Sequence, residues 1–337
     1  MDIRNAVIEL IINYMRGIEM ISLIDFNKSD IAKFVYYGGD AGAKDAIIYE
    51  DDVWMLKYPK TTRDFVNPQI SYTTSPLSEY IGSKIYEALR IPVHETLLGI
   101  RNNKLVVACK DFTRKKADTN GSNGVNYLRL IPFHDLKNSF MAGDLDTYSG
   151  TGSETLLNEV LATITGQIDL KSIPGVLERF WDMFVVDAFI GNNDRNNGNW
   201  GILIDEVNLK TLLAPVFDNG NAFFNKRSIT TMEKRLSDER AMHEDAYITS
   251  RCVYKYTGTD TEGERINPFK FMIQSENNDC NAAVLRFINN MDFSKIKCII
   301  DDIPDVYGTI SIMPESQKRF YLELMKIRLN KIMEIGF

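Results

Sequence analysis

The N-terminal part of the chain changes from a helical repeat of hydrophobic positions to the alternation that is typical of strands. Apolar side chains recur at helical spacing over residues 3–16, and Gly17 follows as a stop signal. We expect an amphipathic helix in an N-terminal extension, residues 1–30, with its apolar face packed on the body rather than on a partner. Residues 31–60 then contain the β-rich runs FVYY, AIIY and VWMLKY, which predict three strands.

A helix and a hairpin follow these strands. The pattern predicts a helix at about residues 76–90 and a hairpin of ETLLGI and KLVVACKDF that turns at 101–103. After Phe112, the polar and turn-rich run TRKKADTNGSNG is typical of a link between two parts of a fold. We therefore expect a strand-rich lobe over residues 31–115.

Helical periodicity dominates the second half of the chain. From about residue 176 onward the pattern predicts helices, except for a hairpin between residues 201 and 217. This predicts a larger, mainly helical lobe over residues 116–337. The expected fold is therefore α+β, with two lobes and a cleft between them.

Composition and charge exclude several classes of protein. The 337 residues are 44% hydrophobic and 25% charged, which is ordinary for a globular protein. The net charge of -7 argues against direct nucleic-acid binding, because such binding rests on clustered Lys and Arg. No apolar run reaches the ~20 residues of a membrane-spanning helix. The cysteines form no CxxC pair and fit reduced thiols in the cytoplasm; they are Cys109, Cys252, Cys280 and Cys298.

Carboxylates and lysines must carry any chemistry, because the chain has only 3 histidines. The strongest candidate is the stretch GNNDRNNGNWG. The run VLERFWDMFVVDAFI before it predicts a buried helix that ends at Gly191, so Asp194 lies in a loop that leaves a rigid helix. Asn199 follows in the same loop, and Asp218 begins a DNG sequence just after a predicted strand.

This order of residues matches that of phosphoryl-transfer sites: a base, a metal-binding amide and a metal-binding carboxylate. Each residue alone has a simpler explanation, an Asx turn for Asp194 and a strand-end turn for Asp218. The combination with charged residues upstream favours a functional site.

A lysine and a glutamate upstream complete the candidate site. In VWMLKYP, the alternation puts Lys57 on the same strand face as Met55, where a charged side chain needs a partner. Glu79 is the best candidate, because it shares a face of the predicted helix with the small residues Gly82 and Ser83. The alternative is that Lys57 and Glu79 are two unrelated exposed charges.

A glycine-rich turn, YYGGDAGAK, lies upstream of Lys57. Its backbone amides could approach phosphates, although a plain hairpin turn explains the glycines equally well. The turn is not a P-loop of the GxxxxGK[ST] type, because its lysine is followed by an aspartate. The candidate phosphate contacts are Gly38, Gly39, Gly42 and Lys44.

Six ordered segments resemble the HipA-like serine/threonine kinases: YGGDAGAK, WMLKYP, LSEYIGSKIYEALRIPVHETLLG, VVACKDF, FWDMFVVDAFIGNNDRNNGNWG and APVFDNG. The likeness is greatest to the compact branch of that family, typified by cell-translocating kinase A. It runs from about residue 36 to residue 224 and continues weakly beyond. The resemblance implies a two-lobed protein-kinase-like fold, with ATP and Mg²⁺ as cofactors.

The resemblance also implies a role for each candidate residue. Asp194 would be the catalytic base, Lys57 would contact the nucleotide phosphates, and Glu79 would hold Lys57. Asn199 and Asp218 would bind magnesium. The remaining nucleotide contacts would be the backbone of Lys110 and Phe112, at a hinge between the lobes, and Asn196, which replaces a histidine frequent in the family.

The family's toxin members act on translation components such as a tRNA synthetase, and many pair with a DNA-binding antitoxin. The resemblance therefore implies a protein substrate and a protein partner of antitoxin or host type. By analogy with the compact branch, it also leaves secretion as an effector open. The glycine turn contains no Ser, so the inhibitory phosphorylation of that loop in some relatives does not carry over, whereas autophosphorylation elsewhere is expected.

Two other classes of function stay open. A lipid or small-molecule kinase would use the same site, since the D-R-x-x-x-N arrangement also occurs in phosphoinositide kinases; TRKKAD is the one short basic run that would suit a membrane surface. A non-catalytic ATP-binding signalling protein is the other class. Against it, every charged position expected of a catalytic site is filled.

Overall fold

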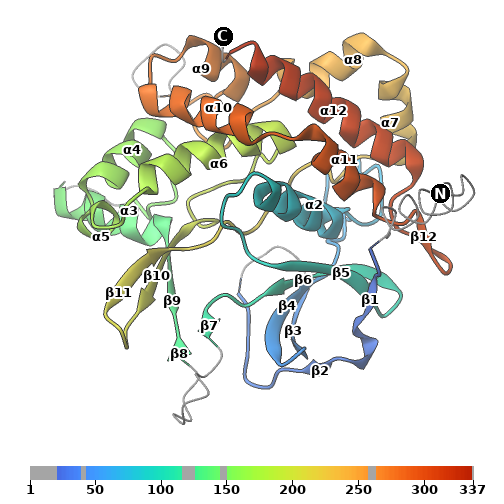
Figure 1. Ribbon diagram of the computed structural model, residues 1–337, viewed down its shortest axis with the longest axis horizontal. Coiled ribbons are helices and arrows are strands. Elements are labelled where there is room, and N and C mark those ends of the chain that lie inside the picture. The colour runs from blue at the N-terminus through green and yellow to red at the C-terminus, as the bar shows by residue number, and fades with distance from the viewer. Residues whose placement is uncertain (1–20, 39–42, 116–125, 145–149, 257–262, 336–337) are drawn as a thin grey trace, which may run out of the picture.

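The computed structural model describes residues 21–38, 43–115, 126–144, 150–256 and 263–335. Its N-terminal part is a six-stranded sheet in the order β1-β5-β6-β4-β3-β2, and helix α2 packs against β5 and β6 (Figure 1). Neighbouring strands are antiparallel, except that β1 and β5 run parallel. The elements are β1 (Ile24–Asp25), β2 (Asp30–Ile31), β3 (Lys44–Tyr49), β4 (Asp52–Lys57), α2 (Ser75–Ala88), β5 (Thr96–Arg101) and β6 (Lys104–Lys110).

The strands confirm most of the pattern predicted for this sheet. The runs AIIY and VWMLKY lie in β3 and β4, and β5 and β6 form the predicted hairpin. Asn102 and Asn103 turn that hairpin with φ of 50° and 56°, left-handed values that asparagine tolerates. The strand prediction for FVYY is wrong. Phe34 has a φ of 63°, outside the strand region, and β2 takes the place beside β3 instead.

The sheet also extends into residues 1–30, which the sequence pattern assigned to a separate extension. β1 pairs with β5, and the fully buried Phe26 packs with Ile47 and Trp54 in a small core on one face of the sheet. The pattern missed this because β1 is only 2 residues long and leaves no recognisable alternation. The amphipathic helix predicted over residues 3–16 lies outside the described residues.

The rest of the chain is mainly helical and surrounds α6. Helix α6 coincides with the run VLERFWDMFVVDAFI and ends at Gly191, whose φ of 72° is the left-handed value typical of a helix stop. In this part of the chain the first helix begins at Phe133, earlier than the predicted residue 176. The elements are α3 (Phe133–Asp144), α4 (Leu157–Gly166), α5 (Ile168–Lys171), α6 (Val176–Ile190), α7 (Ile229–Leu236), α8 (Glu239–His243), the π-helix η2 (Glu244–Ile248), α9 (Pro268–Gln274), α10 (Asn278–Asn290), α11 (Phe293–Asp301) and α12 (Glu315–Met333).

A three-stranded sheet and two short hairpins complete the described part of the chain. The predicted hairpin after residue 201 is formed by β10 and β11, and β9 pairs with the other side of β10. The strands are β9 (Arg129–Pro132), β10 (Gly201–Asp205) and β11 (Lys210–Leu213), with the short pairs β7 (Arg114–Lys115) and β8 (Asn126–Tyr127), and β12 (Val306–Tyr307) and β13 (Ile310–Ser311).

The chain leaves this hairpin at residue 213, earlier than predicted, and turns toward the N-terminal sheet. Val216 forms a bridge with Val93, in the segment that follows α2, and its amide donates to the Pro92 carbonyl at 2.9 Å. His94 in turn donates its amide to the Val216 carbonyl at 3.0 Å. These contacts bring the DNG sequence that starts at Asp218 under helix α2.

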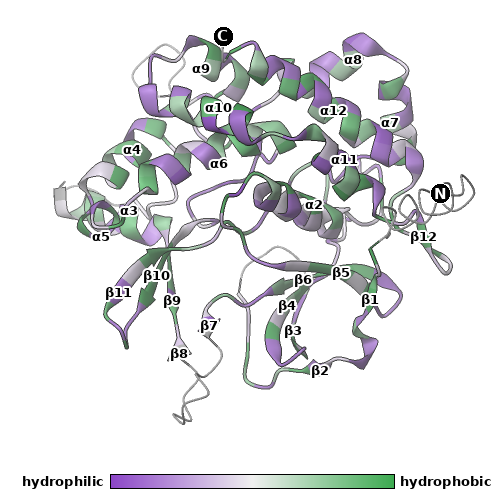
Figure 2. Cartoon of the chain, viewed as in Figure 1, coloured by the Kyte–Doolittle hydropathy of each residue, from purple (hydrophilic) through white to green (hydrophobic). Residues whose placement is uncertain are grey.

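One hydrophobic core joins the two parts of the fold. It contains α2 side chains such as Leu77 and Ile81 together with Phe184 and Phe189 of α6 and Phe320 of α12. Figure 2 shows hydrophobic residues along β10 and an alternation of hydrophilic and hydrophobic residues around α12. No helix in the described ranges has the length and apolar character needed to cross a membrane.

Candidate active site

A cavity of about 210 Å³ lies where α2 and β4 meet the helical part. Its walls include Lys57, Glu79, Asp194 and Asp218. Residues that lie far apart in the sequence therefore meet at one cavity, because the segment after β11 runs back under α2.

Lys57 contacts two of the carboxylates that line this cavity. Its ammonium nitrogen lies 2.8 Å from Glu79 Oε2 and 3.1 Å from Asp218 Oδ1. The expected alternation of β4 is present, because Met55 packs toward the main core beside Lys57 whereas Trp54 packs into the small core of the opposite face. Burial opposes the charge of Lys57, but Asp218 and Glu79 outweigh it and raise the pKa of Lys57 well above its usual value.

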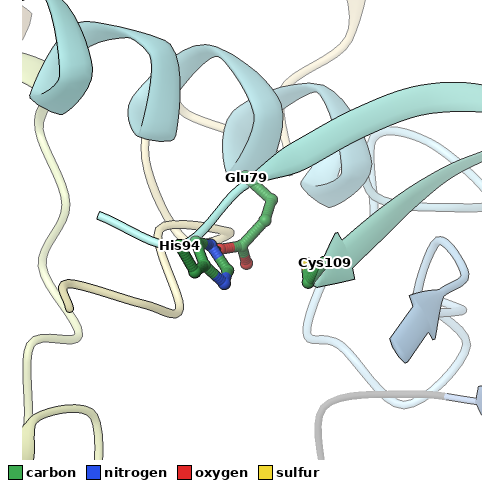
Figure 3. A group of neighbouring side chains, drawn as sticks. All are labelled: Glu79, His94 and Cys109. Carbon is green, nitrogen blue, oxygen red and sulfur yellow. The ribbon is translucent and has the colours of Figure 1, made fainter. Parts of the chain in front are cut away.

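The second oxygen of Glu79 is held as firmly as the first. Glu79 Oε1 accepts the backbone amide of Asn219 at 2.9 Å and lies 3.0 Å from His94 Nε2. Burial of Glu79 acts against ionisation, but Lys57 and His94 outweigh it and hold the pKa of the carboxyl well below its usual range. Ser83 Oγ lies 3.2 Å from the same His94 nitrogen and accepts from Asn219 Nδ2 at 3.1 Å. Figure 3 shows the Glu79 carboxylate turned toward the His94 ring.

Gly82 allows this close approach of α2 to the DNG sequence. A β-carbon added at Gly82 would lie 2.8 Å from Asn219 Cβ, so a larger residue would force the helix and the loop apart. Gly82 and Ser83, the small residues on the helix face of Glu79, are therefore explained by the close contact of α2 with Asn219. The contact of His94 with Glu79 was not predicted, since it depends on the pairing of Val93 with Val216.

The loop that carries Asp194 is anchored by the buried pair of Arg195 and Asp187. Arg195 Nε donates to Asp187 Oδ2 at 2.9 Å, from a loop position to a carboxylate of α6. The same guanidinium donates to the Asn199 carbonyl at 3.1 Å and to the Phe217 carbonyl. Arg195 thus ties the Asp194 loop to the strand end before Asp218. Sequence reasoning missed this pair, for which the only signal was the charged Asp187 within the apolar C-terminal run FVVDAFI of α6.

Asparagine side chains fix the shape of the Asp194 loop. Asn196 Nδ2 donates to Asp194 Oδ1 at 3.0 Å, and Asn199 Nδ2 donates to the Asp194 carbonyl at 2.7 Å. Asn192 Oδ1 accepts the Asp194 amide at 3.2 Å. The structure therefore places Asn196 against Asp194, and it leaves the side-chain oxygen of Asn199 as the atom that could bind a metal.

The side chains of Asp218 and Asn199 have the chemistry that suits magnesium. Asp218 has a φ of 61° and a side chain that is 32% exposed, and one of its oxygens, Oδ1, accepts from Lys57. Among the described residues no hydrogen-bond partner is found for Oδ2. Carboxylate and amide oxygens are the ligands that Mg²⁺ prefers, so Asp218 and Asn199 are a suitable pair.

The structure describes part of the predicted glycine turn. Lys44 pairs directly across the sheet with Lys57, which puts both side chains on one face of the sheet, and Lys44 Nζ donates to the Gly38 carbonyl at 2.6 Å. Gly39 and Gly42 lie outside the described residues. Lys44 and Gly38 are therefore close to each other and beside the strand position of Lys57.

The structure shows how the residues of the expected hinge are bonded. The Lys110 amide donates to the Glu95 carbonyl at 2.9 Å within the sheet, so it cannot donate to a base while that bond stands. The Lys110 ammonium pairs with Asp52 at 3.0 Å and with Glu95 at 3.1 Å. Phe112, just beyond the strand, packs on Phe217 with ring centroids 5.6 Å apart. Of the two predicted residues, Phe112 is the better candidate for an adenine contact.

Glu79, His94 and Cys109 also form a buried cluster whose ligand atoms lie within 4.8 Å of one another (Figure 3). Two features disfavour a metal ion there. The Lys57 ammonium already occupies the space beside the Glu79 carboxylate, and burial raises the pKa of the Cys109 thiol. The cluster belongs instead to the support of the Lys57–Glu79 pair.

Comparison with known proteins gives a close relative. No protein-family model matches the chain. The chain is 34% identical over 314 residues to the serine/threonine-protein kinase CtkA of Helicobacter pylori strain J99. The aligned residues cover 93% of this chain and 87% of that protein. The crystal structure of the Helicobacter pylori proinflammatory kinase CtkA matches with a TM-score of 0.77 and 32% identity, over 94% of this chain and 97% of that one.

A more distant likeness is to HipA of Shewanella oneidensis MR-1, solved with HipB and operator DNA. The TM-score is 0.53 at 12% identity, over 96% of this chain and 72% of that one, which shows the fold alone. The two structural matches confirm the predicted α+β, protein-kinase-like HipA fold. Because the sequence relation to CtkA spans nearly the whole of both proteins, this chain belongs to the HipA-like serine/threonine protein kinases, in the branch that includes CtkA.

Proposed function

We propose that this kinase transfers the γ-phosphoryl group of Mg²⁺-bound ATP to a serine or threonine hydroxyl of a protein, and also to itself. The observation that carries the proposal is the position of the Lys57 ammonium, 2.8 Å from Glu79 and 3.1 Å from Asp218, in a cavity that Asp194 also lines. Phosphoryl transfer asks a protein for positioning and charge stabilisation more than for covalent chemistry. These residues supply both.

Each residue of the site has one task in this reaction. Lys57, held by Glu79, positions the nucleotide phosphates, and Asp194 orients the acceptor hydroxyl and takes its proton. The hydroxyl oxygen forms the new bond to the γ-phosphorus as the bond to the β–γ bridging oxygen breaks, and ADP leaves. Asp218 and the side-chain oxygen of Asn199 hold Mg²⁺, which supplies positive charge against the β- and γ-phosphates when it is bound.

The other nucleotide contacts of the proposal surround Lys57. The glycine turn, with Gly38, Gly39, Gly42 and Lys44, covers the phosphates, in support of which Lys44 lies directly opposite Lys57 in the sheet. Asn196 contacts the phosphate end from its place beside Asp194. The backbone at the end of β6, at Lys110 and Phe112, meets the adenine, with the Lys110 amide excluded by its bond to Glu95.

A protein partner is part of the same proposal. The distant HipA neighbour was solved with HipB, which suggests a partner of antitoxin or host type for this kinase. Direct binding of nucleic acid is not proposed, because the net charge of the chain is -7. A cytoplasmic location is supported by the cysteines, which are all free thiols; secretion as an effector is the alternative.

Radiolabel transfer from γ-labelled ATP tests the proposed function. The kinase is incubated with label alone, with a generic protein substrate and with phosphoinositide vesicles, in parallel with its Asp194→Asn variant. We expect label on serine or threonine of the kinase and of the added protein, and none with the variant. Label on the lipid alone would identify a lipid kinase, and no transfer at all would favour a non-catalytic ATP-binding protein.

A further inference from the structure

A second cavity, of about 310 Å³, adjoins the cavity of the catalytic residues. Asn221, Asn225 and Lys226, from the segment after the DNG sequence, line both cavities. The opposite wall includes Asn193, the neighbour of Asp194 in the chain, and Asn221 Nδ2 donates to Asn193 Oδ1 across the gap. A group bound in this second cavity would therefore lie close to the proposed catalytic base, Asp194.

The lining of the second cavity includes a buried arginine that has no ion-pair partner among the residues that the structure describes. Arg328, on α12, is 2% exposed, and its guanidinium donates to the Ala246 carbonyl at 2.9 Å and the Phe189 carbonyl at 3.2 Å. Within the described residues no carboxylate lies within ion-pair distance of it. Burial lowers the pKa of Arg328 to about 10; the Asp245 carboxylate, beyond ion-pair distance, acts in the opposite direction, and Arg227 adds to the lowering. A buried cation without an ion-pair partner is costly, so its place beside a cavity points to an anion that enters.

The residues that line the cavity carry more unpaired positive charges than unpaired negative ones. Both carboxylates among its lining residues are already paired: Asp187 with Arg195, and Asp245 with Arg227 at 3.2 Å. Arg251 is bonded to backbone carbonyls, for example to Ser250 O at 2.7 Å. The lining residues without a carboxylate partner in the described part of the chain are Lys226, Arg251 and Arg328.

This positive cavity stands in contrast to the chain as a whole, whose net charge is -7. Cations that have no protein counter-charge and converge on one concave site favour an anionic ligand, to which charge-assisted hydrogen bonds are the strong ones. The guanidinium groups suit carboxylate and phosphate oxygens better than ammonium groups do, because they offer paired donors in a plane.

We propose that this cavity binds an acidic side chain of the protein acceptor, a carboxylate or a phosphorylated residue near the serine or threonine that is modified. We call this second cavity the anion cavity. The proposal rests on the proposed function for its purpose, since it assigns a sequence preference to the transfer reaction. Arg251 and the buried Arg328 are its specificity-determining residues.

Peptide binding tests the anion cavity without need of catalysis. Four fluorescent peptides, each with one serine flanked on both sides by glutamate, phosphoserine, alanine or lysine, are titrated into the Asp194→Asn variant, and Kd is read from anisotropy. We expect the glutamate or phosphoserine peptide to bind about tenfold more tightly than the alanine peptide, and the lysine peptide more weakly still. The two acidic arms separate a carboxylate from a phosphate as the preferred group.

Substitutions of the two arginines in the same Asp194→Asn protein decide where the preference comes from. Arg251→Met and Arg328→Met should each reduce the ratio of acidic to alanine affinity about tenfold, and Arg251→Glu should shift the preference toward lysine. Because Arg328 is buried and its loss could unfold the protein, the exposed Arg251 variants suffice for the decision. Lys210→Met, on exposed β11 and outside both cavities, is the control that should keep the parent ratio.

Two results would overturn the anion cavity: equal affinity for all four peptides, or an acidic preference that survives both Arg251→Met and Arg251→Glu. Failure of the proposed function would look different. If acidic peptides bind through Arg251 but the parent kinase transfers label from ATP to none of them, to no generic protein and not to itself, the cavity stands and the transfer reaction is wrong.

Discussion

Glu79 Oε1 accepts the backbone amide of Asn219 at 2.9 Å, so helix α2, which carries the ion-pair partner of Lys57, is bonded directly to the residue after Asp218. The ion pair of Lys57 and Glu79, the ring of His94 and the proposed metal-binding loop therefore form one hydrogen-bonded unit. Movement of α2 away from the sheet would break the Lys57–Glu79 pair, and movement of α2 away from the DNG loop would break the bond to Asn219. We infer that the ion pair of Lys57 and Glu79 forms as part of folding and does not need a bound nucleotide.

The first prediction concerns Lys57 and Glu79. Lys57→Met and Glu79→Gln should each lower phosphoryl transfer by at least about tenfold, because a charge-assisted bond between buried partners is lost. Since the two residues act as one unit, the double variant should lose less than the product of the single losses. Initial rates of the four proteins, with circular dichroism as a check of folding, give the comparison. Losses that simply multiply would show that the residues act independently.

His94 should act through Glu79. His94→Phe removes the ring nitrogen 3.0 Å from Glu79 Oε1, and we expect kcat to fall about tenfold with the protein still folded. His94→Gln, which keeps a donor, should recover part of the loss. In the Glu79→Gln background, His94→Phe should have little further effect. A full additional loss in that background would mean that His94 serves a purpose other than holding Glu79.

The buried pair of Arg195 and Asp187 should control stability. Arg195→Met leaves the Asp187 carboxylate buried with its main charge partner gone, and we expect about 3–5 kcal/mol loss in the free energy of unfolding. Urea denaturation measures it. The matched control is Lys331→Met, which breaks a surface ion pair with Glu334 and should cost less than about 1 kcal/mol. Similar losses in the two variants would show that Arg195 is no anchor of the loop.

Nucleotide binding should stabilise the fold. A ligand that binds only the native state adds RT ln(1 + [L]/Kd), which is ~2.7 kcal/mol at a hundredfold excess over Kd. Magnesium and ATP together should therefore raise the melting temperature more than either alone. The absence of any shift at millimolar Mg-ATP would count against the whole nucleotide site.

Periodicity predicted the elements that carry the site, and long-range contacts explain what it missed. The strand of Lys57, the helix of Glu79 and the helix before Asp194 each have a complete local pattern. The place of His94 depends on a bridge between Val93 and Val216, far apart in the chain, which no local pattern contains.

The same distinction holds for the residues that were placed wrongly or not at all. The FVYY run has strand composition, but Phe34 adopts a left-handed φ and the sheet edge is filled by a pair of residues from earlier in the chain. The expected contact of Lys110 backbone groups with adenine stays a prediction, and the structure adds that the Lys110 amide donates to the Glu95 carbonyl. The Arg195–Asp187 anchor joins a loop to a helix interior, so neither residue is distinctive in its own segment.

Asp194 is proposed to serve transfer and Asp218 to bind the metal, and calorimetric titration of ATP with and without magnesium separates the two roles. Both proteins, Asp194→Asn and Asp218→Asn, are also assayed for transfer. The account predicts that Asp194→Asn loses about 10²–10⁴-fold in transfer yet keeps the magnesium-dependent affinity for ATP. Asp218→Asn should lose activity and most of the magnesium dependence. An active Asp194→Asn, or an Asp218→Asn that binds Mg-ATP like the parent, would contradict the account.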